Sequence, residues 1–124
     1  MKKIAVVEDN PDNRLLVAAL LDDRYLIIEF ECGPDALVAM PLDRPDLVLL
    51  DISLPQMDGS EVLRRMKEDD RLADIPVIAL TAHAGPADRD RFISEGFDDY
   101  ITKPILDEQV LISAIDRLIQ GKSP

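Results

Sequence analysis

The run Leu47-Val48-Leu49-Leu50 is continuously apolar, and an acid, Asp51, follows it directly. Such a run is typical of a central strand in a parallel sheet, because helices cover both faces of that strand. Residues 77–80 form another run of this kind, and residues 4–7 form a similar one. We therefore predict three strands here, and polar residues follow each of them.

Helix patterns with recognisable start signals separate these runs. Asn10 can cap a helix that has Pro11 at its first position. Leu16, Ala19 and Leu20 share one face of that helix. This stretch is therefore predicted to be helical.

Two later helices carry equally clear signals. Asp58 and Glu61 form a capping-box-like start for a helix from Ser60 to about Glu68. The last helix has an apolar stripe with the helical period of about 3.6 residues. The stripe consists of Val110, Leu111, Ala114, Ile115, Leu118 and Ile119. The pairs Gly33-Pro34 and Gly85-Pro86 mark the entries of two further helices.

Strands and helices thus alternate along the chain, with a further strand at residues 26–30 and a shorter one at residues 100–102. This alternation predicts an α/β fold: a doubly wound five-stranded parallel sheet with helices on both faces. Right-handed crossovers favour the strand order 2-1-3-4-5. Ligands of such sheets bind beyond the carboxyl ends of the strands, at the switch point between strands 1 and 3.

Composition excludes several classes of function. The chain has 124 residues and a formal net charge of −11, so we expect neither nucleic-acid nor membrane binding. No apolar run approaches the roughly 18 residues of a membrane-spanning helix. Cys32 is the single cysteine, which excludes an internal disulfide. A reducing compartment fits best, and we expect a cytoplasmic protein.

Polar residues follow four of the predicted strands. Glu8 and Asp9 follow the first strand, Asp51 the third, Thr81 the fourth and Lys103 the fifth. Two carboxylates about 5 Å apart repel by about 3 kcal/mol at a dielectric constant near 20, so three of them protonate one member or recruit a cation. Oxygen ligands of this kind suit Mg²⁺, which supports phosphoryl transfer. The chemistry that fits is an Asp nucleophile that forms an acyl phosphate.

Five short motifs resemble the CheY-like receiver domain of two-component response regulators. They are Glu8-Asp9-Asn10, Asp51 after its apolar run, Leu54-Pro55-Gln56-Met57-Asp58-Gly59, Leu80-Thr81-Ala82 and Thr102-Lys103-Pro104. The resemblance covers essentially the whole chain and implies a flavodoxin-like (βα)5 fold. We expect one receiver domain, residues 1–124, without an output domain. The motifs are most similar to single-domain regulators of the DivK type and to receivers of hybrid kinases.

The resemblance implies a metal-dependent phospho-acceptor. Asp51 is the expected acceptor, and Mg²⁺ is the expected cofactor. Asp9 and Asp51 are expected to bind Mg²⁺ through their side chains, Ser53 through its backbone carbonyl, and Glu8 through a water molecule.

The resemblance also implies residues that bind the phosphoryl oxygens and a residue that changes conformation on phosphorylation. Thr81 and Lys103 are expected to contact the phosphoryl group, and the Lys103–Pro104 bond is expected to be cis. Tyr100 stands where the family has an aromatic switch residue, with an ordinary half-buried tyrosine as the alternative. His83 either tunes the lifetime of the phosphorylated state or is an exposed loop residue.

The implied function is a phosphorylation-activated switch, not an enzyme beyond Mg²⁺-dependent self-phosphorylation and autodephosphorylation. A histidine kinase or a histidine phosphotransfer protein is the expected donor. The surface of the fourth helix, fifth strand and fifth helix is expected to control a protein partner. The chain is expected to be a monomer, or a weak dimer on activation. The alternatives are a phosphorelay intermediate that passes the group onward and an interaction module that needs no phosphorylation.

Two enzyme-like readings fit less well. A flavin-binding electron carrier needs a loop after the first strand that accepts phosphate, whereas residues 8–12 are acidic and repel it. A phosphatase with an Asp nucleophile needs a second acid two residues later, where this chain has Ser53.

Overall fold

The computed structural model describes residues 1–82, 85–105 and 107–120. Within these ranges five parallel strands form one sheet in the predicted order, β2-β1-β3-β4-β5. The strands are β1 (Lys3–Val7), β2 (Leu26–Phe30), β3 (Leu47–Asp51), β4 (Val77–Thr81) and β5 (Asp99–Thr102). Asp51 and Thr81 are thus the last residues of two neighbouring central strands.

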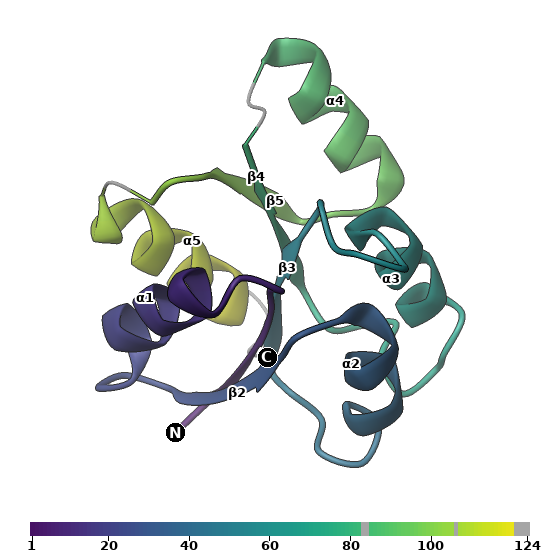
Figure 1. The fold of residues 1–124 in the computed structure, drawn as a ribbon, viewed down its shortest axis with the longest axis horizontal. Helices are drawn as coiled ribbons and strands as arrows, with labels where there is room; N and C mark the ends of the chain where they lie inside the picture. The colour runs from purple at the N-terminus through teal and green to yellow at the C-terminus, as the bar shows by residue number, and fades with distance from the viewer. Residues whose placement is uncertain (83–84, 106, 121–124) are drawn as a thin grey trace.

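Helices follow the strands and cover both faces of the sheet (Figure 1). They are α1 (Pro11–Leu21), α2 (Gly33–Ala39), α3 (Gly59–Lys67), α4 (Pro86–Glu95) and α5 (Glu108–Gln120). Helices α1 and α5 lie on one side of the sheet, α2 and α3 lie on the other, and α4 projects at the top of the view. This arrangement confirms the predicted flavodoxin-like α/β fold. None of the helices in the described ranges is long and apolar enough to cross a bilayer.

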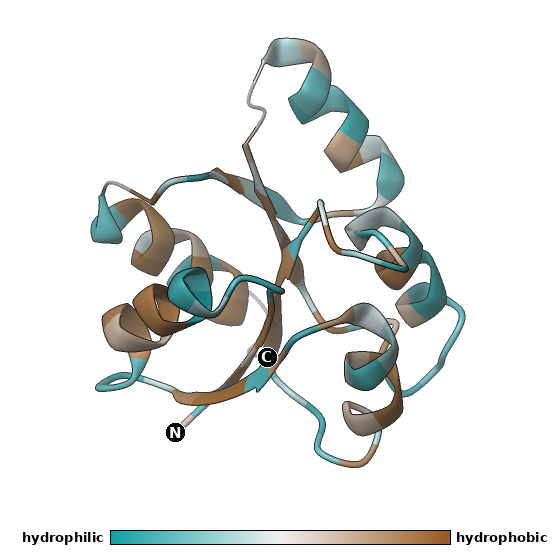
Figure 2. Cartoon of the chain, in the orientation of Figure 1, coloured by the Kyte–Doolittle hydropathy of each residue, from teal (hydrophilic) through white to brown (hydrophobic). Residues whose placement is uncertain are grey.

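Successive residues of the central strands send their side chains into two separate apolar clusters. Leu47 and Leu49 belong to the cluster beneath α1 and α5, whereas Val48 and Leu50 belong to the cluster beneath α2, α3 and α4. The strands are accordingly hydrophobic along most of their length, and the helices carry hydrophilic residues as well (Figure 2). Burial on both faces explains why these strands are apolar without alternation.

Two helices begin as their sequence signals predicted. The Asn10 side chain accepts hydrogen bonds from the backbone N–H groups of Asp12 and Asn13, at 2.8 and 3.2 Å. The Asp58 side chain accepts one from the backbone N–H of Glu61 at 2.9 Å. These caps satisfy N–H groups that have no partner inside the helix.

The buried face of α1 is not the face that Leu16, Ala19 and Leu20 share. This helix buries Val17 and Leu21, whereas Leu16 is 42% exposed and Ala19 is also exposed. Residues 15–21 are all apolar, so α1 is apolar around its whole circumference over this stretch. Periodicity cannot identify the buried side of such a helix.

The stripe predicted for the last helix is correct except at Val110. This residue is 54% exposed, and Ile112 is buried in its place. The buried face is centred on Leu111 and Ile115. At about 100° per residue, Ile112 lies closer to that centre than Val110 does.

Candidate functional site

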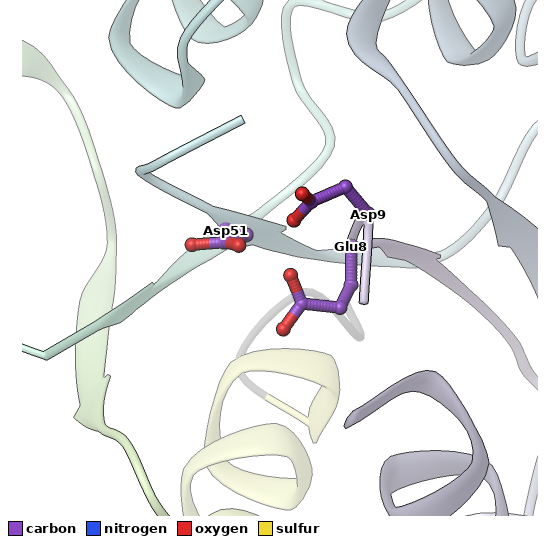
Figure 3. A group of neighbouring side chains, drawn as sticks. All are labelled: Glu8, Asp9 and Asp51. Atoms are coloured by element: carbon purple, nitrogen blue, oxygen red, sulfur yellow. The ribbon is translucent and has the colours of Figure 1, made fainter. Parts of the chain in front are cut away.

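Three acids from two neighbouring strands meet at the carboxyl edge of the sheet (Figure 3). Glu8 and Asp9 follow β1, and Asp51 ends β3, which is the direct neighbour of β1. One carboxylate oxygen from each acid lies within 4.8 Å of the other two. Glu8 and Asp51 are buried, whereas Asp9 is exposed. The cluster therefore occupies the predicted switch point and is open on one side.

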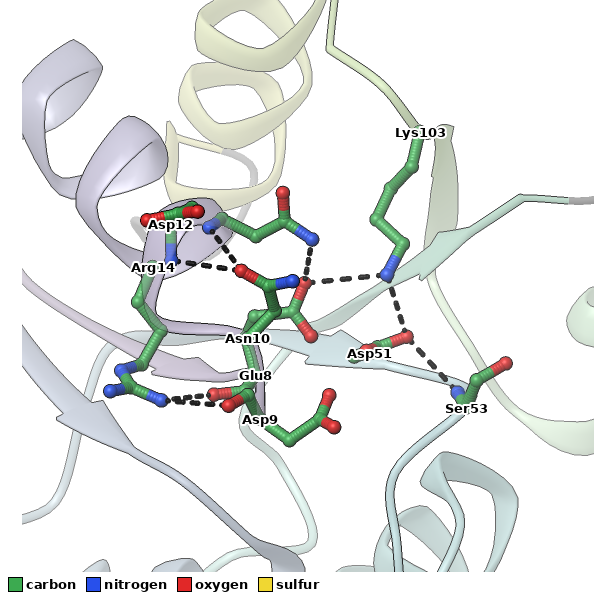
Figure 4. Close-up of polar contacts among 9 residues, drawn as sticks. Glu8, Asp9, Asn10, Asp12, Arg14, Asp51, Ser53 and Lys103 are labelled. Atoms are coloured by element: carbon green, nitrogen blue, oxygen red, sulfur yellow. Dashed lines mark hydrogen bonds and ion pairs between the residues drawn. The ribbon is translucent and has the colours of Figure 1, made fainter.

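Lys103 places a positive charge between two of these acids (Figure 4). Its Nζ lies 3.3 Å from Oε1 of Glu8 and 3.1 Å from Oδ1 of Asp51. The backbone N–H of Ser53 donates to the same Asp51 oxygen at 3.0 Å. The peptide bond from Lys103 to Pro104 is cis. One oxygen of Asp51 is thus held by two donors.

These contacts set the charge states of the site. Burial and the neighbouring Asp51 carboxylate together raise the pKa of Glu8 from 4.5 to about 7. Burial acts to raise the pKa of Asp51, but the neighbouring Glu8, the Ser53 N–H and Lys103 hold it below its ordinary value. Burial acts to lower the pKa of Lys103, but both carboxylates raise it. Asp51 is therefore ionised and Lys103 protonated at neutral pH, while Glu8 is near its midpoint.

The first turn of α1 holds the Glu8-Asp9 pair from the other side. The Asn13 Nδ2 donates to Oε1 of Glu8 at 2.9 Å. The Arg14 Nη1 donates to the backbone carbonyls of Glu8 at 2.8 Å and of Asp9 at 3.3 Å. Sequence reasoning missed both residues. The available signal was their place in the first turn of a capped helix that directly follows the acids.

The donor set fits a hard divalent cation. Within the described ranges, Oε2 of Glu8 is a buried oxygen without a hydrogen-bond partner. A buried carboxylate oxygen in this position favours a proton or a cation beside it. The cluster offers oxygen ligands only, and the exposed side at Asp9 leaves room for water, as Mg²⁺ prefers. The residues present therefore fit Mg²⁺.

Two further predicted residues lie on β4 and β5, on the side of β3 away from β1. Thr81 is buried at the end of β4, and Tyr100 on β5 is half-buried and pairs in register with Ala79. Since side chains alternate along a strand, Ala79 and Thr81 share a face of the sheet. The Tyr100 ring packs 6.2 Å from the Phe92 ring of α4, measured between centroids. His83 lies outside the described residues.

Helix α3 begins against the backbone of the strand that carries Asp51. A Cβ atom on Gly59 would lie 2.5 Å from the carbonyl oxygen of Asp51 and 2.9 Å from the Cα of Ile52. The Gly59 N–H donates to the Ile52 carbonyl at 3.0 Å. Backbone atoms cannot rotate away as a side chain can, so only glycine fits here.

Comparison with known proteins agrees with this fold and this site. The model of the response regulator receiver domain matches residues 4–116, and the chain belongs to this family. It is 43% identical over 105 residues to the polar-differentiation response regulator DivK of Brucella anthropi, covering 84% of this chain and 85% of DivK. It is 39% identical over 121 residues to the response regulator PleD of Caulobacter vibrioides, covering 97% of this chain but only 26% of PleD. The chain thus spans about a quarter of PleD and most of DivK.

Solved receiver domains have the same fold. One belongs to a signal transduction histidine kinase from Syntrophus aciditrophicus, with a TM-score of 0.89 and 35% identity over 99% of this chain and 93% of that one. Another is the receiver domain of the sensor histidine kinase PA1611 from Pseudomonas aeruginosa, with a TM-score of 0.86 and 32% identity over 96% of this chain and 98% of that one. The PA1611 structure has a magnesium ion coordinated in its active-site cleft.

Proposed function

We propose that this protein is a phosphorylation-activated switch of two-component signalling, in which Asp51 accepts a phosphoryl group from a phosphohistidine. The observation that carries this proposal is the contact of buried Asp51 with Lys103 beside Glu8, at the switch point of the sheet. The ionised carboxylate of Asp51 can act as a nucleophile, and the ammonium of Lys103 can bind the oxygens of an incoming phosphoryl group. The likeness to DivK over most of both chains also supports it.

Asp9, Asp51 and the backbone carbonyl of Ser53 would hold Mg²⁺, and Glu8 would reach it through a water molecule. Bound Mg²⁺ offsets the negative charge of the acids and of the phosphoryl oxygens. The magnesium ion in the cleft of the PA1611 receiver domain supports this assignment. We therefore expect phosphorylation to require Mg²⁺.

The transfer is a displacement at phosphorus. A carboxylate oxygen of Asp51 attacks the phosphorus atom of a phosphohistidine and forms the new O–P bond. The P–N bond breaks, and the imidazole nitrogen leaves with its electron pair. Lys103, whose pKa is raised above its ordinary value, stays protonated and pairs with one phosphoryl oxygen. The Thr81 hydroxyl donates to another.

The phosphoryl group adds about −1.5 to −2 charges beside Thr81. In the proposed switch, Thr81 moves toward the new oxygens and Tyr100, which lies next to Ala79 on the neighbouring strand, turns into the vacated space. Tyr100 packs against Phe92, so its movement alters how α4 lies against β5. Two or three charge-assisted hydrogen bonds of about 1.5–3 kcal/mol each supply the roughly 5.5 kcal/mol that such a population shift needs.

The partner that reads the switch would bind the surface formed by α4, β5 and α5. The donor, a histidine kinase or a phosphotransfer protein, would dock beside the site on α1. There Leu15 is 70% exposed and Leu16 is 42% exposed. Leu16 and Ile105 line the same small cavity as Glu8 and Lys103. An apolar surface next to the acceptor favours a protein as the donor.

The test is an intact-mass measurement after incubation with Mg²⁺ and acetyl phosphate. We expect one added phosphoryl group on the wild type and none on Asp51→Asn or without metal. Asp12→Asn is the matched control, because it removes an exposed acid of the same region that lies outside the cluster. It should still be phosphorylated.

Some receivers take small donors poorly, so an unmodified wild type would next be tested with a histidine kinase and for beryllium fluoride binding. A negative result in all three experiments would overturn the proposal. It would favour an interaction module that needs no phosphorylation.

A further inference from the structure

Asn13 ties the carboxylate of Glu8 to the first turn of α1. Its Nδ2 donates to Oε1 of Glu8 at 2.9 Å, and Lys103 lies 3.3 Å from the same oxygen. Glu8 stands at the end of β1, so this hydrogen bond joins the strand end to the helix that follows it. Asn13 has no part in the roles that the family resemblance implies.

The two oxygens of Glu8 are in different surroundings. Oε1 has two donors, whereas Oε2 is buried and has no partner among the described residues. The terminal torsion angle of a Glu side chain has a broad distribution, so the apolar stem alone does not fix the plane of the carboxylate. The hydrogen bonds from Asn13 and Lys103 hold Oε1 and leave Oε2 available, and the bond from Asn13 is the shorter of the two.

Arg14, the next residue of the same turn, contacts the backbone of Glu8 and not its carboxylate. Arg14 donates to the backbone carbonyls of Glu8 and Asp9, and it also lies 3.5 Å from the Glu29 carboxylate. Arg14 therefore fixes the backbone, and the Glu8 carboxylate is oriented by Asn13 together with Lys103. An amide is suited to this role because it donates without adding a positive charge that would repel a divalent cation.

We propose that Asn13 is a positioning residue of the Mg²⁺ site, which holds Oε1 of Glu8 so that Oε2 is presented to a metal-bound water. This inference rests on the proposed function, since it concerns the same Mg²⁺ site. Asn13 acts through Glu8 alone and does not itself touch the metal or the phosphoryl group. Residues that orient metal-binding carboxylates typically change metal affinity when they are replaced.

The test replaces Asn13 by leucine, whose side chain has a similar shape but no N–H group. Titration calorimetry with MgCl₂ measures the dissociation constant of the wild type and of Asn13→Leu. We expect the variant to bind Mg²⁺ about tenfold more weakly, the lower end of the range for such residues. Ala19→Leu is the matched control, because Ala19 is exposed on the same helix, about a turn and a half further on. It should bind Mg²⁺ like the wild type.

A double-mutant cycle separates positioning from a general effect on α1. In a Glu8→Gln background the carboxylate that Asn13 orients is absent. The further change Asn13→Leu should therefore alter the Mg²⁺ dissociation constant by less than about twofold, the level at which independent sites add. Urea unfolding of all variants establishes that each one is folded under the titration conditions.

The outcomes distinguish this inference from the proposed function. A tenfold loss that disappears in the Glu8→Gln background supports Asn13 as a positioning residue. An equal loss in both backgrounds, or no loss in either, overturns that assignment and leaves the proposed function standing. A wild type that binds no Mg²⁺ overturns both.

Discussion

Replacing Glu8 with glutamine separates the charge of this buried acid from its shape. In Glu8→Gln, the side-chain oxygen can still accept the hydrogen bonds from Asn13 and Lys103. The new amide nitrogen takes the place of Oε2, which has no partner among the described residues. Without Mg²⁺, we expect this variant to be more stable than the wild type above neutral pH.

The sign follows from the raised pKa of Glu8. The unfolded chain releases this proton near pH 4.5 and the folded protein near pH 7, so between these values the folded state binds more protons. The free energy of unfolding of the wild type therefore falls as the pH rises through this window. A pKa raised from 4.5 to about 7 corresponds to about 3 kcal/mol. Glutamine does not titrate, so the variant loses none of this free energy of unfolding as the pH rises.

Other titrating groups do not obscure this window. The lowered pKa of Asp51 adds stability that is lost only as the pH falls below about 4. The raised pKa of Lys103 adds stability that is lost only above about pH 10.

The assay is urea unfolding followed by circular dichroism, at intervals from about pH 5 to about pH 8, with EDTA in every buffer. The stability of the variant should exceed that of the wild type by less than about 1 kcal/mol near pH 5 and by about 3 kcal/mol near pH 8. Saturating Mg²⁺ should remove most of the fall in the wild type, because the cation favours the ionised acids. A stability difference that stays constant across this range would refute the reasoning.

Two further predictions concern a close backbone contact and a buried hydrogen bond. Gly59→Ala places a Cβ 2.5 Å from a backbone oxygen and should cost about 2–3 kcal/mol in urea unfolding and slow the phosphorylation of Asp51. Gly85→Ala, whose nearest contact would be 3.4 Å away, should cost much less, and equal losses in the two variants would contradict the steric argument. Tyr25→Phe removes the hydrogen bond that the buried tyrosine donates to Asp116 on α5, and should cost about 1–2 kcal/mol. An unchanged unfolding midpoint would show that this bond contributes nothing.

The sheet and the location of the site could be predicted because each rests on a local signal. The run 47–50 is apolar on both faces, as a central strand must be, and the helix caps at Asn10 and Asp58 are short-range patterns. Once the strand order is known, Asp51 must lie beside Glu8 and Asp9, since the carboxyl ends of β1 and β3 are neighbours. Five residues from four strand ends could thus be assigned to one edge of the sheet.

The rest depends on tertiary packing that no local pattern records. Residues 15–21 are apolar throughout, so only the packed helix shows that Val17 and Leu21 face the sheet. The hydrogen bond from Asn13 to Glu8 depends on how α1 leaves the strand end. The raised pKa of Glu8 depends on burial as well as on spacing, and the sequence indicates only that three acids are near each other.

The sheet divides the apolar interior into two layers that do not share side chains. Tyr100 and Phe92 belong to the layer beneath α2, α3 and α4, whereas Val17 and Leu21 belong to the layer beneath α1 and α5. Volume changes in separate layers influence each other only if the strands between them shift, so their effects on stability should add. The packing of α4 can therefore change without disturbing α1, whereas a change in the packing of α5 reaches the layer that α1 shares. Of the surface proposed to bind a reader, only the α4 side can thus vary independently of the helix proposed to bind the donor.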